Sequence, residues 1–145
     1  MYAAIDLHQK TVQLVLKDEP GQIANESKTS NDANNILEFL SGSDATVVME
    51  SGYNHEHIYD LLKEEGYDVK VAHPLMVKAI AYAKVKNDKV EARMLADLLR
   101  LDMIPESYIP SIETRELKDL ARRKHYFVST RTMFKNKTHA ELSRR

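Results

Sequence analysis

The sequence contains no cysteine and only four glycines among its 145 residues. Without cysteine, disulfides, thiolate metal sites and a cysteine nucleophile are all excluded. The absence is typical of a reducing cytosol, and we expect a cytoplasmic protein. So few glycines leave no glycine-rich phosphate loop, and neither a Ser-x-x-Lys nor a Gly-x-Ser-x-Gly signature occurs. No apolar run approaches the roughly 20 residues of a membrane span, and the N-terminus lacks the pattern of a secretion signal.

The length suits about one domain with a real hydrophobic core, and 43% hydrophobic with 30% charged residues is typical of a globular protein. The net charge of −1 hides an asymmetry. Residues 1–110 hold 11 basic and 18 acidic side chains, whereas residues 111–145 hold 10 basic and 4 acidic ones. A basic C-terminal segment behind an acidic domain indicates a nucleic-acid contact, although a solvated helix face has the same charge pattern.

Apolar patterning predicts an α/β fold with a mixed sheet. Three short strands joined by tight connections are expected first and form an antiparallel meander. Two further strands then alternate with helices, and a helix opened by Asn87 or Asp88 follows. The expected strands are residues 2–8, 11–16, 22–28, 46–49 and 67–72, and the expected helices start at Ser30 or Asn31, Asn54, Pro74, Asn87 or Asp88, and Ser111.

The last helix has few strongly apolar positions and reaches Arg144-Arg145 without a capping residue. We interpret it as the beginning of an arm or coiled coil in a natural protein that continues. The predicted organisation is therefore a catalytic domain over residues 1–110, followed by a basic helical arm over residues 111–145.

Carboxylates occupy unusual places in this pattern. Asp6 lies inside the first strand, where aspartate is depleted and is seldom buried without a partner or a metal. Glu50 ends an apolar strand, and Asp88 and Glu91 share one helix face three residues apart. If the first strand is central, Asp6 and Glu50 meet at the carboxyl ends of neighbouring strands. Four such carboxylates favour one or two Mg²⁺ or Mn²⁺ ions, because their charges repel one another without a cation.

Each carboxylate also has a purely structural explanation. Asp6 can accept backbone N–H bonds, and Glu50 can be an ordinary loop acid. Asp88 and Glu91 form an Asp-x-x-Glu capping box, which explains that pair alone. Only the combination with Asp6 and Glu50 favours the metal site.

Histidines near the expected strand ends, and two residues beside Glu50, are weaker candidates for contacts with a metal or a substrate. These are His8, His55, His57, His73, Tyr53 and Asn54. Basic side chains beside the acidic pair and along the last helix are candidates for phosphate contacts. These are Lys84, Lys86, Lys89, Arg122, Arg123, Lys124, Arg131, Lys135 and Lys137.

Four segments together resemble the IS110/IS1111-family transposases: residues 4–8 (AIDLH), 48–53 (VMESGY), 72–74 (AHP) and 86–92 (KNDKVEA). The resemblance covers nearly the whole chain and matches the N-terminal, RuvC-like domain of that family. It implies an RNase H-like fold with a five-stranded mixed sheet. It also implies an Asp-Glu-Asp-Asp tetrad for divalent metal, carried here by Asp6, Glu50, Asp88 and Glu91.

Two residues depart from the family pattern. Asn87 stands where threonine is usual, and Glu91 stands where aspartate is usual, so that its carboxylate reaches one methylene further.

The resemblance further implies a prokaryotic recombinase that cleaves and joins mobile-element DNA. It implies a structured guide RNA as partner, assembly into a dimer or higher homo-oligomer, and a second domain that carries a serine nucleophile. That second domain is not among these 145 residues, so we expect metal binding here without full recombination. Two alternatives stay open. One is a stand-alone RuvC-like nuclease or junction resolvase, and the other is a non-catalytic nucleic-acid-binding and dimerisation module. A sugar-kinase or actin-like ATPase half would need glycine-rich phosphate loops, which the chain lacks.

Overall fold

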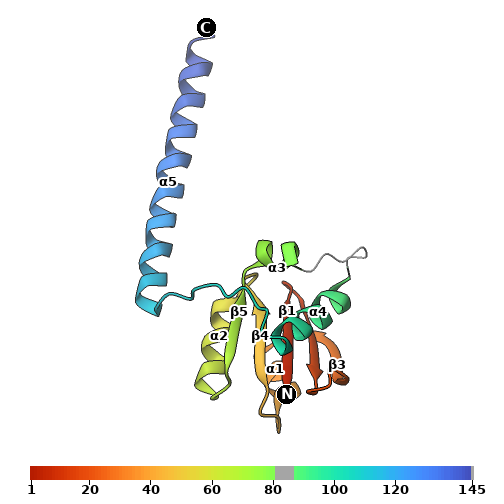
Figure 1. Cartoon of the computed structure of the whole chain (residues 1–145). Coiled ribbons are helices and arrows are strands. Elements are labelled where there is room, and N and C mark those ends of the chain that lie inside the picture. The colour runs from red at the N-terminus through yellow and green to blue at the C-terminus, as the bar shows by residue number, and fades with distance from the viewer. Residues whose placement is uncertain (81–86, 145) are drawn as a thin grey trace. The chain divides into compact units, whose positions relative to one another are not determined.

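The computed structural model describes residues 1–80 and 87–144, which form two compact units, Met1–Ile109 and Pro110–Arg145. In the first unit a five-stranded sheet has the order β3-β2-β1-β4-β5. Its strands are β1 (Tyr2–Leu7), β2 (Thr11–Lys17), β3 (Ile23–Ser30), β4 (Thr46–Glu50) and β5 (Val69–Ala72). β1 pairs antiparallel with β2 and parallel with β4. The predicted mixed sheet and the RNase H-like fold are confirmed (Figure 1).

Helices cover both faces of the sheet, and an apolar cluster lies on each face. Successive residues of β1 belong alternately to the two clusters, because side chains alternate along a strand. Ile5 belongs to the cluster that contains Ile36 and Ile58, from α1 (Ala33–Leu40) and α2 (His55–Glu64). Ala4 belongs to the other cluster, which contains Val77 and Leu95. Those residues come from α3 (Pro74–Ile80) and α4 (Asp88–Arg100). β1 is thus buried on both faces, which explains its continuous apolar sequence.

One helix start differs from the sequence prediction, and one predicted cap residue makes no capping bond. The prediction that Ser30 or Asn31 caps the first helix is wrong: Asp32 is the N-cap and accepts a hydrogen bond from the Asn34 amide at 2.8 Å. Its short side chain reaches that amide, while β3 continues to Ser30. Asn54 precedes α2 as predicted, yet its backbone is left-handed (φ 56°) and its side chain makes no capping bond.

α4 lies across the central strands and is held by apolar contact. Leu95, Leu98 and Leu99 are at most 6% exposed. Full burial of a leucine stabilises a fold by roughly 1.5–3 kcal/mol, so this face fixes α4 on β1 and β2. The start of α4 is thereby held close to the carboxyl end of β1, so that Asp88 lies near Asp6. Figure 1 shows α4 beside the central strands.

The second unit is one helix, α5 (Ile112–Leu142), which begins at Ser111 as predicted. The Ser111 hydroxyl accepts a hydrogen bond from the Thr114 amide at 3.4 Å. α5 has no buried residue, and its large apolar side chains are exposed. Within residues 1–80 and 87–144, no helix is long and apolar enough to cross a membrane.

Candidate metal centre

Strand register aligns four polar side chains in one row on the face covered by α4. Asp6 of β1 pairs with Gln13 of β2, and Gln13 pairs with Lys28 of β3. Glu50 extends the row on β4, because the preceding residues, Ile5 and Met49, are partners in the parallel pairing. Asp6 therefore lies between a carboxylate on one side and a buried amide on the other.

Asp6 is buried, with 8% of its surface exposed. Its Oδ2 atom has no hydrogen-bond partner among the described residues. The alternative in which this carboxylate is satisfied by backbone N–H groups therefore does not account for Oδ2. Burial raises the pKa of Asp6 above its ordinary value, and the negative charges of Glu91 and Asp88 raise it further, whereas His8 opposes the rise. A buried, under-bonded carboxylate is what a bound cation would stabilise.

Asp88 is the first residue of α4, and its environment is more polar. Asn87 is the actual N-cap, since its side chain accepts a hydrogen bond from the Lys89 amide at 3.0 Å. The capping-box explanation for Asp88 and Glu91 is therefore wrong, and the Asp88 carboxylate is available for other contacts. Lys28 donates to Asp88 Oδ2 at 2.8 Å, and this bond is the main reason that the pKa of Asp88 is lowered.

Ion pairs between α4 and the hairpin strands fix the position of Asp88. Glu26 of β3 accepts two hydrogen bonds from Arg93, at 2.7 and 2.8 Å, and it also pairs with Lys89 at 2.7 Å. Two parallel bonds from one guanidinium restrict both distance and orientation. Further along α4, the buried Lys17 ammonium lies 2.6 Å from Asp97.

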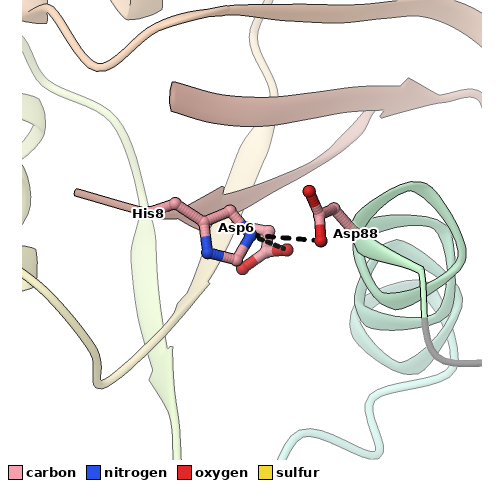
Figure 2. Close-up of side chains that lie close together, drawn as sticks. All are labelled: Asp6, His8 and Asp88. Atoms are coloured by element: carbon pink, nitrogen blue, oxygen red, sulfur yellow. Dashed lines mark ion pairs between the residues drawn. The ribbon is translucent and has the colours of Figure 1, made fainter. Parts of the chain in front are cut away.

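Asp6, His8 and Asp88 converge on one point, as Figure 2 shows. His8 follows the end of β1, and its Nε2 atom lies 3.2 Å from Asp6 Oδ2 and 3.4 Å from Asp88 Oδ1. One ligand atom from each residue falls within 4.8 Å of the others. The donor set fits a divalent ion, because the two carboxylates supply hard anionic oxygens and two of the three atoms, Asp6 Oδ2 and His8 Nε2, are buried without a hydrogen bond.

Residues 3–144 match the family model of the DEDD-type IS110 transposases, which is described as a transposase. The chain belongs to this family. A comparison with curated proteins found no match. Membership supports a transposase of mobile elements and implies DNA binding, and the predicted resemblance is confirmed.

The two remaining predicted members of the transposase tetrad lie beside this convergence. Glu50 ends β4, next to the end of β1, and is half-buried. Glu91 lies one turn along α4 from Asp88, and its charge acts on Asp6. Among the described residues, the group that meets within 4.8 Å comprises Asp6, His8 and Asp88 alone. The ligand roles of Glu50 and Glu91 stay predictions.

The basic residues predicted to contact nucleic acid fall into three classes. Lys84 and Lys86 lie outside the described residues. Lys89 pairs with Glu26 and borders a cavity of about 280 Å³ beside Asp88, which Lys28 also lines. The others lie exposed on α5, where Arg122 pairs with Asp119 at 3.1 Å; these are Arg122, Arg123, Lys124, Arg131, Lys135 and Lys137.

Two participants in this transposase site, Gln13 and Lys28, were not predicted from the sequence. Their proximity to Asp6 and Asp88 follows from the register of the β1–β2–β3 meander, which contains an irregularity between Leu16 and Lys17. Among the weaker candidates, only His8 reaches the acidic pair. His55 Nδ1 instead lies 2.8 Å from the carbonyl oxygen of Gly52.

Proposed function

We propose that Asp6 and Asp88 bind a divalent cation, Mg²⁺ or Mn²⁺, and that this domain serves metal-assisted phosphodiester cleavage and strand transfer on mobile-element DNA. The observation that carries the proposal is the buried Asp6 carboxylate, whose Oδ2 lacks a hydrogen bond among the described residues. One oxygen of this carboxylate lies within 4.8 Å of an oxygen of Asp88. A bound divalent ion supplies charge stabilisation at a phosphodiester oxygen. Glu50 and Glu91 complete the proposed ligand set at the edges of the cluster.

The surroundings of the cluster support a phosphate-containing substrate. The ammonium groups of Lys28 and Lys89 line the cavity next to Asp88, where they can neutralise a nucleic-acid backbone. The exposed basic side chains of α5 offer a second contact of the same kind. We extend the proposal to a guide RNA and to a homo-oligomer of the full protein, which rest on family resemblance and on the exposed apolar side chains of α5.

Anomalous X-ray scattering from crystals of the full chain grown with Mn²⁺ tests the site. We expect a peak within bonding distance, about 2.0–2.6 Å, of oxygens of both Asp6 and Asp88. Asp6→Asn and Asp88→Asn should each abolish the peak, because each removes an anionic ligand. Asp102→Asn is the matched control, since Asp102 is 90% exposed at its side chain and pairs with Lys70 instead.

The same crystals separate the proposal from one of the two alternatives, the non-catalytic module. A non-catalytic module would bind DNA without the cation, so the absence of any peak at millimolar Mn²⁺ would favour that function and contradict ours. A peak that persists in Asp6→Asn would place the ion elsewhere and would also contradict the proposal.

A further inference from the structure

His8 is placed between the two carboxylates by its backbone. Its amide donates to the Thr11 carbonyl oxygen at 2.9 Å, which closes the β1–β2 connection. Its own carbonyl oxygen accepts a hydrogen bond from the Asn31 side chain at 2.7 Å. These two bonds join the backbone of the residue to the hairpin and to the segment after β3, so the position from which its ring projects is fixed.

The imidazole edge that faces the carboxylates is unusual. The ring as a whole is half-exposed, yet Nε2 is buried and has no hydrogen-bond partner among the described residues. It lies 3.2 Å from one carboxylate oxygen and 3.4 Å from another, without the alignment of a hydrogen bond to either. Nε2 is shared between the two carboxylates as an ion-pair partner, so that one nitrogen and one oxygen of each acid point toward the same small volume. A divalent ion in that volume can be bound by all three side chains.

The spacing of the three atoms suits a shared ion. Adjacent ligands of an octahedral ion with bonds of about 2.1 Å lie about 3.0 Å apart, and opposite ligands about 4.2 Å apart. The measured separations of 3.2 and 3.4 Å are close to the first value, and all three atoms fall within 4.8 Å. Small rotations of the side chains would therefore bring the three ligand atoms to bonding distance of one ion.

We propose that His8 Nε2 is a direct ligand of the divalent cation together with Asp6 and Asp88, and that it makes the site favour a first-row transition ion such as Mn²⁺ over Mg²⁺. The proposal rests on the proposed function, because it presupposes a cation at Asp6 and Asp88. Mg²⁺ is a hard ion that keeps to oxygen ligands and loses water reluctantly. Mn²⁺ also prefers oxygen, but as a transition ion it tolerates one imidazole nitrogen at a lower cost than Mg²⁺ does. A site of oxygens alone would lack this discrimination.

Pulsed electron paramagnetic resonance of Mn²⁺ bound to the full chain detects a nitrogen ligand of the ion directly. We expect electron spin-echo modulation from a directly coordinated imidazole ¹⁴N in the unaltered chain. In His8→Asn this modulation should vanish, the Mn²⁺ affinity should fall about tenfold, and the Mg²⁺ affinity measured by competition should change less than about twofold. His57→Asn is the matched control, because His57 is exposed on α2 on the other face of the sheet.

Each other outcome overturns a distinct claim. Mn²⁺ bound without ¹⁴N coupling, and lost in Asp6→Asn, would refute the role of His8 while the proposed metal site stands. An equal loss of Mn²⁺ and Mg²⁺ affinity in His8→Asn would refute the discrimination. No Mn²⁺ binding at all would refute both proposals. A thermal melt of His8→Asn that matches the parent chain shows that the variant is folded.

Discussion

The Lys28 ammonium lies 2.8 Å from Asp88 Oδ2. It is therefore a positive charge next to the carboxylate that we propose as a ligand of the cation. We predict that Lys28→Gln tightens Mn²⁺ binding. In the metal-free protein the ammonium stabilises ionised Asp88 and lowers its pKa. Once a divalent ion binds to the same carboxylate, the ammonium and the ion repel each other, and the substitution removes that repulsion.

The magnitude follows from Coulomb's law. The Lys28 ammonium lies 2.8 Å from Asp88 Oδ2, whereas Oδ1 faces His8, so an ion bound about 2.1 Å from Oδ1 lies roughly 5–7 Å from the ammonium. The Lys28 side chain is 52% exposed, so a water-like dielectric constant applies. A single and a double charge about 6 Å apart in water repel by roughly 1.4 kcal/mol, and screening at low salt reduces this to about 1 kcal/mol. The dissociation constant for Mn²⁺ should therefore fall roughly fivefold.

Titration of free Mn²⁺ by electron paramagnetic resonance at pH 7.5 and low ionic strength measures the change. Lys89→Gln is the matched control, since its ammonium pairs with Glu26 rather than with Asp88 and should alter the affinity less than about twofold. The gain in Lys28→Gln should shrink as KCl is added. Weaker binding in Lys28→Gln would show that Lys28 positions Asp88 for the ion, and would refute the reasoning.

Three further predictions concern stability and DNA binding. Asp97→Ala should lower the free energy of unfolding by about 2 kcal/mol, because it leaves the buried Lys17 ammonium unpaired. Lys17→Met removes the charge together with its partner's role and should cost less than about 1 kcal/mol. Urea unfolding measures both values, and equal losses would contradict the prediction. Burial raises the pKa of Asp6, so the folded metal-free protein binds more protons than the unfolded one, and Asp6 lowers stability as pH rises above the ordinary aspartate value. Asp6→Asn should remove that fall above about pH 4 in EDTA, and an unchanged slope would contradict it. Replacing all three basic residues at 122–124 with glutamine should make DNA affinity less dependent on salt. Fluorescence anisotropy at several salt concentrations gives the slope of log affinity against log salt concentration, which should become shallower by up to about 0.9 per lost phosphate contact. An unaltered slope would exclude these residues of α5 from the interface.

The sheet could be predicted because its strands are short, apolar and separated by strong turn residues. β1 reads as a continuous apolar run because it is buried on both faces, and the connection at Asp18–Gly21 is too short for a crossover. Local rules also predicted Ser111 as a helix cap, since its hydroxyl acts within one turn. They were wrong where neighbouring residues can both cap, as at Asn31 and Asp32. The Asn31 side chain and amide donate to the carbonyl oxygens of His8 and Lys10, which leaves Asp32 to cap the helix.

The site itself could be predicted only in part. Asp6 and Asp88 stand out as carboxylates in unusual sequence positions, and the structure places them in one cluster. Gln13 and Lys28 carry no such signal, because a polar residue on an amphipathic strand is ordinary. Their role depends on which residues face one another across two strand pairs, and a shift of one residue would move them to the other face of the sheet.

Asp6 and Asp88 are 82 positions apart in the chain, and this separation has a consequence for the protein during its synthesis. At roughly 5–20 residues per second, a ribosome needs roughly 4–16 s to extend the chain from the first carboxylate to the second. Throughout that interval the nascent hairpin exposes Asp6 without its partner. In our proposal the growing chain therefore lacks the complete cation site. That site is assembled only when α4 has left the ribosome and docked on the sheet.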